Sequence, residues 1–188
     1  MEEQIMNMPA VALRGLTILP GMIAHFDISR ERSLRAVEEA MEQDQKIYLV
    51  TQRNVDSEDP TQEDLYQMGI VADIKQVVRL QNDVVRILVD GISRAALLGF
   101  TGNEKYLEAE ICYCDSNADS LPEDLREAML LGVREAFHRY AAVVGKISKE
   151  LIRQIDQYED LEKLIDYVTN NLPVSYELKP VSYTHLTL

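Results

Sequence analysis

The three histidines are the first residues to consider for catalysis or metal binding. His25, His138 and His185 are far apart in the chain and match no metal-ligand spacing. His138 follows the apolar Phe137 in a segment with helical periodicity, and a histidine on a helix face is usually solvated or hydrogen-bonded. The histidines therefore predict neither a metal site nor a catalytic base.

Two cysteines, Cys112 and Cys114, lie two positions apart in a segment with strand character. Side chains at that spacing point to the same face of a strand, and a disulfide between such close neighbours would be strained. The spacing also differs from that of CxxC redox pairs and zinc sites. We therefore expect two small apolar thiols that face the core.

Gly145-Lys146 is the segment most similar to a phosphate-binding loop. Such a loop needs glycine where Tyr140 stands and a hydroxyl where Ile147 stands, so the motif fails. The sequence also lacks the GxGxxG, GxSxG and HExxH motifs. We therefore predict no catalytic, cofactor-binding or metal-binding residues, and a domain that binds, positions or assembles other molecules.

The chain is strongly acidic. Its 188 residues include 32 Asp and Glu against 19 Lys and Arg, a formal net charge of −13. This excess repels nucleic-acid phosphates and anionic lipids, so we expect neither as a partner. The N-terminus, Met1-Glu2-Glu3-Gln4, is acidic where a signal peptide is basic, and no apolar run is long enough to span a membrane. These features predict a cytoplasmic protein.

The predicted secondary structure changes from strands to helices near residue 117, and the part before that residue is β-rich. Met8 to Ile28 is apolar but broken by turn residues, which predicts two short strands. One helix follows, with Ser29 as its expected N-cap. Further strands are predicted over residues 46–51, 69–80, 84–89, 94–100 and 106–115.

After residue 117 the apolar residues recur every three to four positions, which is the spacing of a helix. One long helix begins after Ser120 or Leu121, which compete as its cap. A second helix is predicted from Ser148, and a third ends before Pro173. The apolar stripe of the long helix consists of Leu125, Met129, Val133, Phe137, Tyr140 and Val144. These elements predict an α+β fold with a β-rich lobe over residues 1–117 and a helical lobe over 118–179.

Several segments, taken in order, resemble the N-terminal domain of the Lon protease family. The opening strand carries the matching pairs Leu13-Arg14 and Pro20-Gly21. Val89-Asp-Gly-Ile-Ser-Arg94 is similar to the V-x-G-x-x-R turn of that family. The resemblance covers residues 8–179 and includes segments 8–22, 30–41, 46–52, 59–72 and 161–168.

This resemblance implies a PUA-like β pseudo-barrel with one inserted helix, followed by a small helical bundle. It also implies a non-catalytic domain that recognises unfolded or damaged polypeptides and helps to assemble its parent. That parent would be a cytoplasmic, hexameric serine protease that uses ATP and Mg outside this fragment. The alternative is a stand-alone PUA-type module for RNA or a small molecule, because fold alone does not decide function.

The last nine residues, 180–188, depart from the family pattern. Pro180-Val-Ser-Tyr183 repeats Pro173-Val-Ser-Tyr176, and the long helix expected after residue 179 does not follow. We expect a non-native or truncated tail there and exclude it from the fold.

Apolar residues around the Pro20-Gly21 turn form the predicted substrate-binding patch. A turn is too small to bury all the apolar residues between 16 and 23, although they could also be the rim of a core. A methionine in such a patch adapts to varied partners. The candidate binding residues are Leu19, Met22, Ile23, Tyr66 and Met68.

Overall fold

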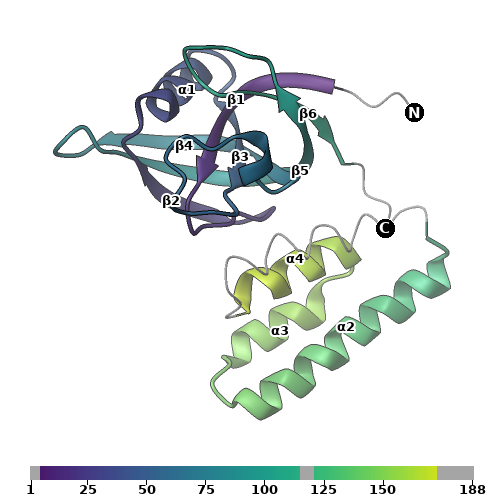
Figure 1. Ribbon diagram of the computed structural model, residues 1–188. Coiled ribbons are helices and arrows are strands. Elements are labelled where there is room, and N and C mark those ends of the chain that lie inside the picture. The colour runs from purple at the N-terminus through teal and green to yellow at the C-terminus, as the bar shows by residue number, and fades with distance from the viewer. Residues whose placement is uncertain (1–4, 115–120, 173–188) are drawn as a thin grey trace. The chain divides into compact units, whose positions relative to one another are not determined.

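The computed structural model describes residues 5–114 and 121–172, which form two compact units. The first unit, residues 5–114, is a β-sheet structure with one inserted helix, and the second, residues 121–172, is helical (Figure 1). The predicted boundary between residues 117 and 118, and the tail over 180–188, lie outside the described residues.

The first unit is a pseudo-barrel of six strands. They are β1 (Ile5–Leu13), β2 (Ile23–Ile28), β3 (Lys46–Thr51), β4 (Met68–Arg79), β5 (Val85–Phe100) and β6 (Glu108–Tyr113). The order is β2-β5-β4-β3-β1-β6, and an additional β5–β6 pairing closes five of the strands into a ring. Strand β2 lies outside that ring and pairs only with β5 among the described strands. The β1–β3 pair is parallel and the other pairs are antiparallel.

Strand β5 is one long strand where the sequence predicted two. Its first half pairs with β2, its second half pairs with β6, and β4 runs along both halves. Gly91 lies at the change of partner, where the register against β4 shifts between Val71 and Ala72. The turn predicted over 89–94 is therefore wrong, because polar and glycine residues here mark a β-bulge inside a strand.

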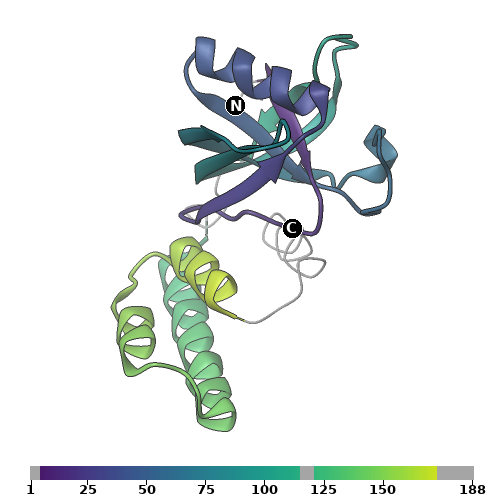
Figure 2. The same ribbon diagram turned by 90° about the vertical axis from the view of Figure 1, so that its left-hand side faces the viewer.

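Helix α1 (Glu31–Glu42) packs on β1 and β3 and is the blue-purple helix across the strands in Figure 2. Its buried face, Ala36, Val37 and Ala40, joins a core that includes Val11 and Leu13 of β1. The helix starts one residue later than predicted. Arg30 rather than Ser29 occupies the N-cap position, and its side chain makes no capping hydrogen bond.

The second unit packs α2 (Glu123–Val144), α3 (Lys149–Gln157) and α4 (Leu161–Asn171) around Leu130, Phe137, Ile155 and Leu164. The helix predicted from Ser148 is α3, and Ser148 is its N-cap, since its hydroxyl accepts a hydrogen bond from the amide of Leu151 at 3.1 Å. The α2 cap was wrong: the helix begins after Pro122.

The predicted α2 stripe is only partly buried. Leu125, Met129 and Val144 are exposed, whereas Leu130 and Ala141 are buried in their place. Helix α2 has 22 residues, against 9 in α3 and 11 in α4, so it is about 33 Å long against about 14 and 17 Å. Leu130 is buried one position after the exposed Met129, so the buried face of α2 is offset from the predicted stripe at this end. The α+β class, with a pseudo-barrel, one inserted helix and three later helices, is confirmed.

Candidate functional site

The predicted apolar patch is mostly part of the core. Leu19 is fully buried and Met68 is 8% exposed, and the partly buried Met22 packs against both. The prediction that Leu19 lies on the surface is therefore wrong. The physical reason is Gly91: its missing side chain lets the Leu19 carbonyl approach so closely that a Cβ there would lie 2.3 Å from the oxygen.

The other two candidates do not join this cluster. Ile23 is 67% exposed and lies beside Asp90 in the β2–β5 register. Tyr66 is half-buried, and the guanidinium of Arg53 lies 4.7 Å from the centre of its ring. The structure thus brings Leu19, Met22 and Met68 together and leaves Ile23 as the exposed member.

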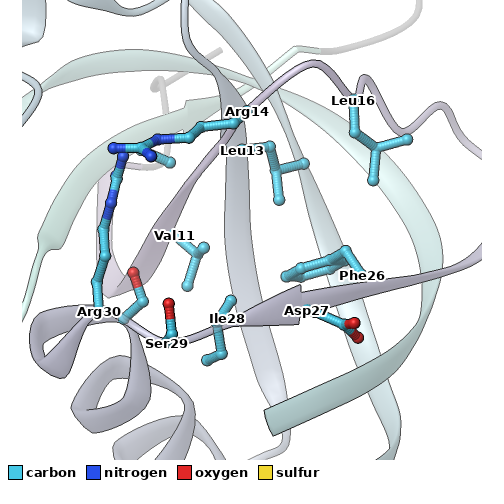
Figure 3. A pocket seen from close by; sticks show the side chains of 11 residues that line it. Val11, Leu13, Arg14, Leu16, Phe26, Asp27, Ile28, Ser29 and Arg30 are labelled. Carbon is cyan, nitrogen blue, oxygen red and sulfur yellow. The ribbon is translucent and has the colours of Figure 1, made fainter. Parts of the chain in front are cut away.

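A pocket of about 220 Å³ opens between β1 and β2, two strands that do not pair with each other. Figure 3 shows apolar side chains along its walls and two arginines meeting at one end. Val11, Leu13 and Ile28 are buried and form the inner wall, and Leu16 and Phe26 are half-buried at the other end. The pocket therefore has one apolar wall, while Ser29, Ser33 and the two arginines make the rest of its lining polar and one end basic.

The basic end consists of Arg14 and Arg30. Nη2 of Arg14 donates to the carbonyl oxygen of Ser57 at 2.9 Å, and Nη2 of Arg30 donates to the same oxygen at 3.0 Å. The side-chain amide of Gln52 donates to it as well, at 3.1 Å. A carbonyl oxygen has two lone pairs, so three donors compete for one acceptor. The site has more hydrogen-bond donors than protein acceptors.

Charge at this end is only partly compensated. Burial lowers the pKa of Arg30, the charge of Arg14 lowers it further, and Glu58 and Asp59 act in the opposite direction. Asp59 itself pairs with Arg32 at 3.2 Å. Within the described residues no carboxylate forms an ion pair with either Arg14 or Arg30.

Asp27 also lines the pocket but does not neutralise the two arginines. Both of its oxygens accept hydrogen bonds from Arg86, at 2.7 and 2.8 Å. The hydrogen bonds from Arg86 hold the pKa of Asp27 below its usual value, so the carboxylate stays ionised and engaged with that partner. The only acid among the lining residues is therefore already paired.

Of the residues whose types or motifs suggest chemistry, His185 lies outside the described residues, and Gly145, His138 and the two cysteines are described. Gly145 ends α2 in the left-handed conformation, which is a helix terminus and not a phosphate loop. His138 pairs with Asp156 at 2.8 Å on the surface, as expected of a helix-face histidine. Cys112 and Cys114 form no disulfide. Residues 5–114 and 121–172 hold no cluster of three or more metal-ligating side chains.

Sequence reasoning missed the β1–β2 pocket. In the sequence, Arg14 belongs to a family-like motif and Arg30 begins a family-like segment, and neither position predicts a binding role. Their separation of 16 positions carries no signal, because the path of the chain through β1 and β2 brings them together. The only sign of a basic site in the sequence is that each arginine comes shortly after an apolar strand segment of an acidic chain.

Comparison with known proteins agrees with this architecture. The model of the ATP-dependent protease La (LON) substrate-binding domain matches residues 7–179. The Lon protease of Lachnoclostridium phytofermentans is 36% identical over 179 residues, 95% of this chain and 22% of that protein. Lon protease 1 of Bacillus subtilis is 30% identical over 178 residues, 95% of this chain and 23% of that protein. The chain thus spans less than a quarter of the length of these relatives.

Solved structures support the fold. The N-terminal domain of the Mycobacterium avium complex Lon protease superposes with a TM-score of 0.73 at 16% identity, covering 94% of this chain and 88% of that one. The Lon N-terminal domain protein of Xanthomonas campestris gives a TM-score of 0.51 at 16% identity, covering 89% and 99%. No helix in the described stretches is both long and apolar enough to cross a membrane. The chain belongs to the family of Lon substrate-binding domains, and it is homologous to the N-terminal part of bacterial Lon proteases.

Proposed function

We propose that this chain selects substrates for a Lon-type ATP-dependent serine protease. It binds unfolded or damaged polypeptides in the cytoplasm, helps to assemble a ring of identical subunits, and acts without catalytic residues or a cofactor of its own. The observation that carries the proposal is the match of residues 7–179 to a substrate-binding domain. ATP and Mg would be used by the parent protein outside these residues.

The geometry of the first unit supports this function. Leu16, Met22 and Phe26 are half-buried apolar side chains on or beside the β1–β2 connection, and Leu16 and Phe26 line the pocket. A half-buried apolar surface of this kind suits a disordered chain of varied sequence. Met22 adds a flexible thioether that adapts to different side chains.

A single copy of such a surface binds weakly. The pocket of about 220 Å³ is smaller than the roughly 300–1,000 Å³ of sites that enclose a drug-sized ligand, so it admits no more than one or two side chains. Several copies in one ring would raise the effective concentration of the second and later sites. Useful affinity for a long unfolded substrate therefore depends on assembly.

The test is a titration of the full chain with reduced and alkylated ribonuclease A, with native ribonuclease A as the folded control. We expect the unfolded form to bind and the native form not to bind. Leu16→Ser should weaken binding severalfold, while Val143→Ser, at an 87% exposed position of the helical unit, should leave it unchanged.

The Ile23→Ser variant tests which face of β2 binds the unfolded protein. A loss of binding in this variant alone would move the site to the exposed face that carries Ile23. Equal or absent binding of unfolded and native ribonuclease A would reject the proposed function.

A further inference from the structure

We propose that the β1–β2 pocket binds the carboxyl terminus of a polypeptide, with the terminal carboxylate on Arg14 and Arg30 and the last apolar side chain in the pocket. This inference rests on the proposed function, since it names the part of the substrate that the site receives. It follows from two properties of the pocket, its excess of donors at one end and the apolar wall formed by Val11, Leu13 and Ile28.

The arginine pair is suited to a carboxylate. Each guanidinium carries five N–H donors, yet within the described residues Arg14 donates one hydrogen bond and Arg30 two. The acceptors are neutral: the carbonyl of Ser57 and the side-chain oxygen of Gln52, which Nη1 of Arg30 contacts at 3.1 Å. A carboxylate would add two charged acceptor oxygens where three donors now share one carbonyl, and hydrogen bonds between charged partners are the stronger kind.

The surrounding charge favours an anion at this point. The protein carries a formal net charge of −13, but the acid lining the pocket, Asp27, is bound to Arg86. Glu58 and Asp59 reduce the positive charge beside Arg30 without forming an ion pair with it, and Asp59 pairs with Arg32. The two arginines are therefore a local basic site in an acidic protein.

The walls supply the second half of the recognition. Val11, Leu13 and Ile28 lie between the arginines and the apolar end formed by Leu16 and Phe26 (Figure 3). A chain end with a carboxylate and one or two apolar side chains matches this order of basic and apolar surface. Its volume of about 220 Å³ suits such an end better than a larger ligand.

A peptide backbone can also align with the pocket. No described strand pairs with the second edge of β2, and three residues of β2, Phe26 to Ile28, line the pocket. An extended chain that enters here can pair with that edge, a common mode of peptide recognition. The site would then read an extended, unfolded terminus and exclude a terminus held in folded structure.

The experiment is an NMR titration of the full chain with one short peptide that ends in two leucines. The peptide is prepared as the free acid, as the carboxamide, and as a carboxamide extended by one glutamate. We expect the free acid to bind about tenfold or more tightly than either carboxamide, with shift changes at Phe26, Ile28 and Ser33. The third form shows whether the pocket recognises the terminal carboxylate or any carboxylate, because its only carboxylate is on the glutamate side chain.

Arg14→Gln should abolish the preference for the free acid, and Arg14→Lys should restore part of it, because lysine keeps the charge but not the planar fork. Arg79→Gln is the matched control, since it removes the same charge from an 83% exposed side chain that pairs with Glu38. If Arg14→Gln does not fold, the three peptides and the shift map on the unchanged chain decide the question.

Equal binding of acid and carboxamide would overturn the inference, and so would an acid preference that survives Arg14→Gln. Tight binding of the glutamate carboxamide would show that an acidic side chain, and not the chain end, is recognised. In each of these cases binding of unfolded ribonuclease A would still support the proposed function. If that protein also fails to bind, the proposed function fails with it.

Discussion

Gly91→Ala is the substitution that most directly tests how the β1–β2 connection is held. A Cβ at this position would lie 2.3 Å from the Leu19 oxygen, 3.2 Å from the Leu19 carbonyl carbon and 3.3 Å from Cγ2 of Ile18. Two of these atoms are backbone, so no rotation of a side chain relieves the contact. The segment that carries the buried Leu19 would have to move.

That movement disturbs a hydrogen-bonded turn. The amide of Gly91 donates to the Met22 carbonyl at 3.0 Å, and the Gly91 carbonyl accepts from the amide of Gly21 at 2.8 Å. Overpacking costs about 1–3 kcal/mol, and weakening one hydrogen bond adds about 1 kcal/mol. We therefore expect the first unit to lose about 2–4 kcal/mol of unfolding free energy.

Urea unfolding of the full chain, followed by resolved amide NMR signals from β3 and β4, measures this loss. Signals from α4 in the same samples report the second unit, which should be unchanged. Gly132→Ala is the control of opposite sign: no atom lies within 4 Å of its Cβ position, so alanine should stabilise α2 by about 0.5–1 kcal/mol. A first unit as stable in Gly91→Ala as in the unchanged chain would refute the close approach of Leu19.

Three further predictions concern the core, a cap and the chemistry. Tyr48→Phe removes a buried hydrogen bond to the Ala95 carbonyl, 3.1 Å long, and should cost about 1–2 kcal/mol at pH 8 in a urea titration. Burial raises the pKa of Tyr48, so between pH 10 and 11.5 the hydroxyl ionises in the unfolded chain but not in the folded one. The stability that the Tyr48 hydroxyl contributes is therefore complete below about pH 10 and falls as the pH rises above that value. In this pH range the Tyr48→Phe variant should lose less unfolding free energy than the unchanged chain. Ser148→Ala should cost the helical unit about 1 kcal/mol, and an unchanged midpoint for the α3 signals would show that this cap contributes nothing. The purified chain should hydrolyse neither ATP nor casein, and turnover above that of a heat-inactivated sample would contradict the absence of a catalytic site.

Local signals predicted the parts of the fold that depend on local pattern. The compact β-branched run over Lys46–Thr51 is a strand with those limits, and Ser148 caps α3. The hairpin around Gln81-Asn82-Asp83 is also present, joining the end of β4 to the start of β5. In each case the boundary that was predicted is marked by the residues around it, so no distant contact is needed to predict it.

The predictions were wrong where contacts between residues far apart in the sequence decide the structure. The bulge at Gly91 reads as a turn in the sequence, but β4 pairs along both sides of it and keeps β5 continuous. Leu125 and Met129 continue the apolar stripe of α2, yet the face that is buried there carries Leu130, one position after Met129. Pattern alone does not reveal which face of a helix its neighbours cover or which strand a strand pairs with.

The same limit applies to the site. The Pro20-Gly21 turn predicted an exposed Leu19, but Gly91, 72 positions after Leu19, makes room for it in the core. The Arg14–Arg30 pair exists because β1 and β2 lie on either side of one opening. A sequence gives the residue types for such a site but not their convergence.

The most direct test of substrate selection uses the Lon protease of Lachnoclostridium phytofermentans. Its N-terminal region is replaced by residues 1–179 of this chain, and the degradation of reduced and alkylated ribonuclease A is measured with ATP present. A version without any N-terminal region and one with Leu16→Ser in the exchanged part serve as comparisons. We predict that the exchanged protein degrades the unfolded substrate faster than the shortened one and that Leu16→Ser lowers kcat/KM severalfold. Degradation no faster than that of the shortened protein, with ATP hydrolysis intact, would contradict a role in substrate selection.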